Sequence, residues 1–219
     1  MLSTIHAALP QTQCTRCGYA DCKAYAQAIA DGSADINQCP PGGQEGVQRL
    51  SALTGRPEQP LNPEHGAEGV RLRMWIDEDW CIGCTLCIKA CPTDAIVGTH
   101  KRMHTVIERW CTGCELCLPV CPVDCIRTES ASGNLTGWAA WSADEAKTAL
   151  ERYEFRSNRL IREEREHQKK LENRAIEKLG DLGKHSHHTD PVVLDKKRQI
   201  IEAAIARARA RQANHPPAD

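Results

Sequence analysis

Two stretches of the chain decide its fold: residues 79–97, DWCIGCTLCIKACPTDAIV, and residues 109–127, RWCTGCELCLPVCPVDCIR. They align without gaps at an offset of 30 residues, as from Trp80 to Trp110, and every cysteine of the first copy has a counterpart in the second. β-like stretches precede them at residues 72–76 and 104–107. The repeat predicts a domain with pseudo-twofold symmetry, in which each half is a pair of short strands and a short helix.

The cysteines of each copy follow the C-x2-C-x2-C-x3-C-P spacing of bacterial dicluster ferredoxins. In that pattern, three thiolates wrap around one [4Fe–4S] cluster and the fourth reaches the other cluster. The spacing therefore predicts two ligand sets. The first set is Cys81, Cys84, Cys87 and Cys121. The second set is Cys111, Cys114, Cys117 and Cys91. Zinc is disfavoured here, because zinc ligands usually come as two separated pairs.

A further four-cysteine set precedes the repeat and consists of Cys14, Cys17, Cys22 and Cys39. Its C-x2-C-x4-C-x16-C spacing is less specific, and zinc is an alternative that the spacing alone leaves open. The two clusters expected next to it favour a third cluster, since an electron carrier uses chains of redox centres. The run KAYAQAIA at residues 23–30 is rich in helix formers and predicts a helix that stops near Gly32.

The thirteenth cysteine and two histidines lie outside these sets. Cys125 occupies the repeat position of Ala95, which favours a small buried side chain; a functional thiol is the alternative. His100 and His104 lie in the connector between the two copies. Because eight cysteines already complete both ferredoxin sites, we interpret these histidines as packed or solvated residues rather than as ligands.

The composition excludes several classes of protein. The chain begins without the basic and apolar regions of a signal peptide and has no stretch of about eighteen apolar residues, so neither a secreted disulfide scaffold nor a transmembrane helix is expected. With 28 basic and 29 acidic residues, it lacks the charge excess of a nucleic-acid-binding protein. No G-x-G-x-x-G motif, phosphate-binding loop or catalytic triad is identifiable. These features indicate an electron carrier with no catalytic site of its own.

The character of the chain changes after Trp141. Ser142 and Glu145 form a capping box that predicts a helix to about residue 179, and Asp190-Pro191 predicts the start of a second helix that runs to about residue 213. Both segments are dense in charged residues. They could pack on the protein's own body, act as a docking arm, or bind a membrane surface; the lack of large aromatic anchors disfavours the last.

One known family matches these motifs together. The segment LPQTQCTRCGYADCKAYAQAIADGSADINQCPPGG at residues 9–43, followed by the repeat, resembles RnfB, the ferredoxin-like component of the Rnf/Rsx electron transport complex, over about residues 5–130. The resemblance implies that the N-terminal set also holds a [4Fe–4S] cluster. It further implies electron transfer between soluble partners and a membrane complex with flavin subunits, which couples transfer to ion movement or keeps a redox-sensing regulator reduced. Family members begin with a membrane-spanning helix, which is not found before Cys14 here.

We therefore expect an α+β protein with four parts. These are an N-terminal single-cluster domain (1–55), a linker (56–70), a dicluster ferredoxin domain (71–130) and a charged helical extension (142–219). The expected function is the relay of single electrons through three [4Fe–4S] clusters in an Rnf-type oxidoreductase; the alternative is a free-standing soluble ferredoxin that serves a separate oxidoreductase. The expected partners are redox proteins, including membrane-bound Rnf-type subunits, and not nucleic acid. The expected location is the cytoplasm or the cytoplasmic face of the inner membrane.

Overall fold

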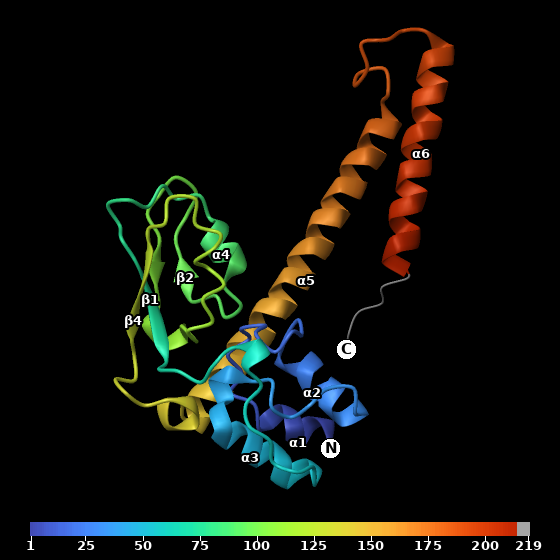
Figure 1. Cartoon of the computed structure of the whole chain (residues 1–219). Coiled ribbons are helices and arrows are strands. Elements are labelled where there is room, and N and C mark those ends of the chain that lie inside the picture. The colour runs from blue at the N-terminus through green and yellow to red at the C-terminus, as the bar shows by residue number, and fades with distance from the viewer. Residues whose placement is uncertain (214–219) are drawn as a thin grey trace. The chain divides into compact units, whose positions relative to one another are not determined.

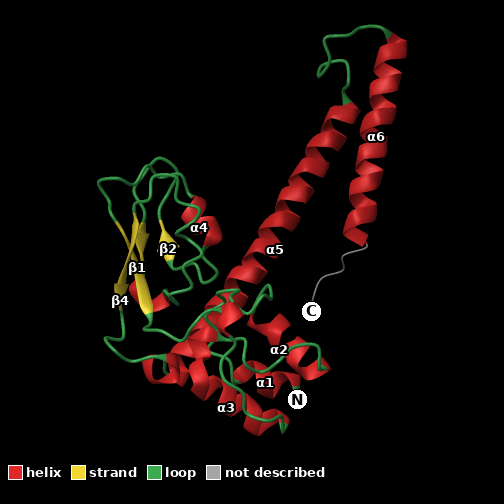
Figure 2. Ribbon diagram, in the orientation of Figure 1, coloured by secondary structure: helices red, strands yellow, loops and turns green. Residues whose placement is uncertain are grey.

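The structure, a computed structural model, describes residues 1–213 of the chain (Figure 1). It contains two compact units, one spanning Met1–Arg156 and the other beginning at Ser157. Figure 2 shows short strands in the first unit and helices in both. This mixture of helices and strands, with helices at the C-terminal end, confirms the α+β class.

Three helices build the N-terminal part: α1 (Leu2–Ala7), α2 (Cys22–Asp31) and α3 (Gly43–Thr54). The predicted helix at residues 23–30 is confirmed as α2. Its N-cap Asp21 accepts a hydrogen bond from the Ala24 backbone N–H at 2.6 Å, and Gly32 ends it in a left-handed conformation. Helix α1 was not predicted, because a six-residue segment without a side-chain cap carries little local signal. It is held by the burial of Ile5 in the core of this part.

Four short strands form two small antiparallel sheets in the repeat region. Strand β1 (Leu72–Ile76) pairs with β4 (Ile126–Ser130), with Met74 opposite Thr128. Strand β2 (Ile96–Val97) pairs with β3 (Thr105–Val106). The stretch predicted at residues 72–76 is therefore a strand, whereas only two residues of the stretch at 104–107 form one. The strands enclose a core that is made largely of the repeat's cysteines and aliphatic side chains.

The two copies of the repeat differ in their helices. The first copy forms α4 (Leu86–Ala90), in which the Lys89 backbone N–H donates to the Thr85 carbonyl at 3.2 Å. The second copy has Pro119 in place of Lys89, and proline has no N–H to donate. Residues 116–120 form turns instead, so the short helix expected in each half occurs only in the first.

The predicted capping box is present at the start of α5 (Ala143–Gly180). The Glu145 N–H donates to Ser142 Oγ at 3.2 Å, and the Ser142 N–H donates to the Glu145 carboxylate at 3.0 Å. Helix α6 (Pro191–Ala213) begins at the predicted proline. Within the second unit, Arg209 of α6 pairs with Glu172 of α5 at 2.7 Å. No helix within residues 1–213 has an apolar stretch long enough to cross a membrane.

The core of the N-terminal part can be tested at α3, which carries two leucines in contrasting environments. Leu50 is 1% exposed, and Leu53 is 41% exposed. Leu50→Ala should lower the free energy of unfolding by about 2–5 kcal/mol, since it removes buried apolar surface and leaves a cavity. Leu53→Ala is the control and should change it by less than about 0.5 kcal/mol. Urea unfolding followed by far-ultraviolet circular dichroism measures both; equal midpoints would contradict the described core.

Candidate functional site

The structure brings four cysteines, three from the second copy and one from the first, to one enclosed space. The remaining walls of this space are mainly apolar and include Met74, Ala95 and Ile96. The four cysteines are Cys91, Cys111, Cys114 and Cys117. Cys91 is the C-cap of α4, so the helix, which itself carries Cys87, separates it from the first two cysteines of its own copy on the preceding loop.

A second space is lined in the reciprocal way. Its apolar walls include Ile76, Ile82 and Val123. The predicted ligands at this space are Cys81, Cys84, Cys87 and Cys121. Two further residues, His104 and Cys125, also line it.

The N-terminal cysteines are also close to one another. Burial raises the pKa of the Cys22 and Cys39 thiols well above the usual range, and negative charge on the other cysteines of this set raises it further. Cys39 interacts with all three of the others, Cys14, Cys17 and Cys22. Cys17 and Cys22 belong to one buried cluster, and Cys39 packs against it.

The backbone of the cysteine loops has a recurrent left-handed pattern. Gly83 and Thr85 have φ values of 66° and 66°, and their counterparts Gly113 and Glu115 have 70° and 64°. Such alternation turns successive N–H groups toward one concave side, where they can hydrogen-bond an anionic group. A Cβ atom at Gly113 would collide with the Leu72 carbonyl oxygen, so this turn also requires glycine for space.

The loop before Cys14 has the same alternation without glycine. Gln11, Gln13 and Thr15 have φ values of 58°, 54° and 60°. Gln13 Oε1 accepts a hydrogen bond from the Cys22 N–H at 3.0 Å, and Gln13 Nε2 donates to Gln11 Oε1 at 3.1 Å. Sequence reasoning missed these two buried glutamines; the available signal was a polar run, PQTQ, directly before the first cysteine.

The arrangement of the thiols fits iron–sulfur groups. Each cysteine set offers four thiol groups, and thiolates are the ligands that hold iron–sulfur clusters. Thiolate sulfurs spread around an apolar space with converging N–H groups are the environment that iron–sulfur clusters require.

Burial and backbone hydrogen bonds act in opposite directions on the pKa values of the ferredoxin cysteines. It raises the pKa of the Cys87 thiol to about 11 and that of the Cys114 thiol to about 12. Burial also raises the pKa of Cys121, but backbone N–H groups, first that of Val123, outweigh it and lower the net value. Metal ligation requires thiolates, so the raised pKa values of Cys87 and Cys114 add to the free energy needed to release their protons when a cluster binds.

Cys125 and His104 are both buried, as expected for packed residues. The Cys125 sulfur lies 3.5 Å from the Cys121 sulfur. His104 contacts two sulfurs of the first set: its Nδ1 lies 3.3 Å from Cys87 Sγ, and its backbone N–H donates to Cys81 Sγ at 3.4 Å. These sulfur contacts were not foreseen from the sequence.

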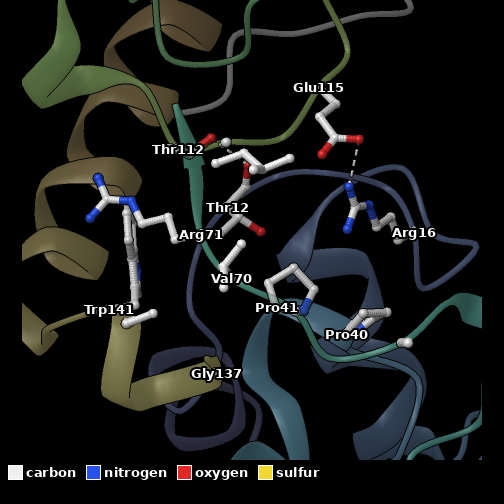
Figure 3. A pocket seen from close by; sticks show the side chains of 15 residues that line it. Thr12, Arg16, Pro40, Pro41, Val70, Arg71, Thr112, Glu115, Gly137 and Trp141 are labelled. Carbon is white, nitrogen blue, oxygen red and sulfur yellow. Dashed lines mark hydrogen bonds and ion pairs between the residues drawn. The ribbon is translucent and has the colours of Figure 1, made fainter. Parts of the chain in front are cut away.

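The N-terminal part meets the repeat next to the second set of cysteines (Figure 3). Thr112 Oγ1 donates a hydrogen bond to the Thr12 carbonyl at 2.9 Å, and Arg16 pairs with Glu115 at 2.8 Å. Thr12 and Arg16 flank Cys14, while Thr112 and Glu115 flank the first two cysteines of the second copy. The N-terminal set is therefore positioned beside the second set.

The first turns of α5 and the residues before them strengthen this junction. Trp141 Nε1 donates to the Pro10 carbonyl at 2.7 Å, and the Arg71 guanidinium lies 3.9 Å from the centre of the Trp141 ring (Figure 3). Arg152 of α5 donates to the Thr93 carbonyl at 3.1 Å and stacks over Trp110. The start of the charged helix is thus part of the first unit.

Comparisons with known proteins agree with this geometry. A family model described as "4Fe-4S dicluster domain" matches residues 74–128, and one described as "Putative Fe-S cluster" matches residues 9–41. No solved structure matches the chain significantly.

Several relatives share one name, that of the B component of an ion-translocating oxidoreductase complex. The protein from Azoarcus sp. (strain BH72) is 61% identical over 138 residues, which cover 63% of this chain and 75% of that protein. The protein from Alkalilimnicola ehrlichii is 53% identical over 146 residues, covering 66% of this chain and 78% of that protein. The protein from Shewanella oneidensis is 52% identical over 138 residues, which cover 63% of this chain and 70% of that protein.

The close approach at Gly113 gives a test of the second site. Gly113→Ala should reduce the iron content of the purified chain by about four atoms, because the added Cβ displaces the loop that carries Cys111 and Cys114. Gly133→Ala is the matched control: its φ is also left-handed, at 61°, but nothing lies within 4 Å of the added atom. Iron and sulfide analysis measures the difference, and equal contents in the two variants would argue against the predicted collision.

Proposed function

Because the chain belongs to the RnfB family, the B component of ion-translocating oxidoreductase complexes, we propose that it relays single electrons in such a complex through three [4Fe–4S] clusters. When bound, these clusters supply one-electron redox chemistry. The protein holds them, shields them from water and positions them. The observation that carries the proposal is the arrangement of the repeat's cysteines around two enclosed apolar spaces, each with three cysteines from one copy and one from the other.

The proposed ligands are the twelve cysteines of the three sets. The N-terminal ligands are Cys14, Cys17, Cys22 and Cys39. Those of the first ferredoxin site are Cys81, Cys84, Cys87 and Cys121. Those of the second are Cys91, Cys111, Cys114 and Cys117. The dihedral angles that recur at an offset of 30 residues support a pseudo-twofold relation between the ferredoxin halves.

We further propose a linear order for the three sites: N-terminal, then second ferredoxin site, then first. Two contacts support this order: the hydrogen bond between Thr112 and Thr12 and the ion pair between Arg16 and Glu115. Both join the loop of the N-terminal site to the loop of the second ferredoxin site. Electron transfer slows steeply with distance, so the adjacent pair exchanges electrons directly. We also propose a division of the chain into three parts and a linker. The parts are residues 1–55, which hold the N-terminal site, residues 71–130 and residues 142–219, and the linker is residues 56–70.

The ligand assignment can be tested with two neighbouring cysteines. Cys121→Ser should lower the content from about twelve iron and twelve sulfide atoms per chain to about eight of each, because it removes one ligand of a cubane cluster. Cys125→Ser is the control, since its sulfur is only 3.5 Å away but is not a proposed ligand. Iron and sulfide analysis with EPR during reductive titration measures both. A wild-type chain with about eight irons and one zinc would overturn the N-terminal cluster.

Membership of a complex can be separated from the free-standing ferredoxin by purification. The tagged full chain, isolated from detergent-solubilised membranes of its host, should bring flavin-containing membrane subunits with it. The control is the same preparation from cells that express the tag alone. Recovery of the whole chain from the membrane-free fraction, without such subunits, would instead favour a ferredoxin that serves a separate oxidoreductase.

A further inference from the structure

One of the equivalent positions at which the two ferredoxin sites differ carries a histidine in only one of them. The offset of 30 residues that relates the two copies pairs Met74 with His104. Both side chains are almost completely buried, and each lines one site: Met74 the second, His104 the first. The repeat therefore offers an internal comparison, in which similar loops carry cysteines around two spaces but only one space receives an imidazole.

The imidazole of His104 is positioned as a hydrogen-bond donor to the first site. Its Nδ1 lies 3.3 Å from Cys87 Sγ, and the side chain is 1% exposed. A cysteine that ligates iron is a thiolate and has no hydrogen to give, so the hydrogen between these atoms must be on Nδ1. The space for the ring depends on Gly98, where an added Cβ would collide with the imidazole.

Among the described residues 1–213, no imidazole lines the second site, and the polar side chains that line it are two threonines. The Met74 thioether has no hydrogen to donate. The threonines are Thr93 and Thr112. The Thr93 hydroxyl donates to the Trp110 carbonyl at 2.8 Å, and the Thr112 hydroxyl donates to the Thr12 carbonyl at 2.9 Å. Thr93 Oγ1 also lies 3.7 Å from Cys91 Sγ, but its one hydrogen is given to the carbonyl at the shorter distance, and the one hydrogen of Thr112 is likewise given to a carbonyl.

We propose that His104 is a positioning residue that raises the reduction potential of the first ferredoxin site above that of the second. The inference rests on the proposed function. Hydrogen bonds to cluster sulfurs favour the more negative reduced state and so raise the potential. One electron then moves spontaneously from the site beside Met74, which is oxidised, to the site beside His104, which is reduced. The first site is thus the exit of the dicluster domain when electrons enter from the N-terminal side.

The test is an EPR-monitored redox titration of the full holoprotein. His104→Met gives the first site the residue that the second site has, and it should lower one ferredoxin potential while leaving the other unchanged. Loss of one hydrogen bond corresponds to about a tenfold lower ratio of reduced to oxidised cluster at a fixed potential, or about 59 mV for a one-electron couple. In His104→Asn the amide N–H can replace Nδ1–H, so the potential of the first site should stay close to the wild-type value. His100→Met, the same change at an exposed histidine of the same connector that lines neither site, is the control and should leave both potentials unchanged.

The outcomes separate this inference from the proposed function. Wild-type iron content with unchanged potentials in His104→Met would overturn the inference and leave the relay standing. A wild-type chain without [4Fe–4S] signals would overturn the relay itself. Should His104→Met fail to assemble its clusters, pulsed EPR of the wild-type chain with isotopically labelled histidine decides the matter. A histidine nitrogen coupled to one reduced ferredoxin cluster supports the inference, and the absence of such a coupling overturns it.

Discussion

Cys91 lies among the cysteines of the second copy, and Cys121 lies among those of the first. The stability of the repeat region depends on this exchange of one cysteine between the two copies. Its strands are only two to five residues long, and sheets of that size are not stable by themselves. A small core in which cysteine sulfurs replace much of the usual aliphatic volume needs further support. A group bound by thiols from both copies would tie the two halves together, so that folding and cofactor binding are coupled.

The loops around the cysteines accept an unfavourable backbone conformation to provide hydrogen-bond donors. Left-handed geometry costs a residue other than glycine about 1–2 kcal/mol, yet Gln11, Gln13 and Thr85 all adopt it. In the N-terminal loop, the conformation is maintained by buried hydrogen bonds between the glutamine side chains and onward to the Cys22 N–H. Backbone of this kind can present N–H groups to an anion, as in other anion-binding backbone nests.

The two cysteine modules are joined by specific polar contacts. The link from Thr112 to Thr12 is buried, and the stacking of Arg71 on Trp141 adds a planar contact beside it. The start of α5 contributes to the same body, because Tyr153 donates to Asp21 and Arg152 donates to the Thr93 carbonyl. A relay needs fixed distances between its centres, and these contacts hold the N-terminal loop against the loop of the second site.

Local features of this protein could be predicted from its sequence. The spacing of the cysteines predicted three sets. Asp21 and Gly32 delimit α2, and Ser142 with Glu145 starts α5, because helix capping acts over a few residues. Pro119 also carried a local signal against a second helix. The tertiary structure alone decided that His104 meets Cys87, 17 residues away, and that Thr112 meets Thr12, 100 residues away. Such contacts depend on how loops close around a shared core, and no periodicity or short motif encodes that closure.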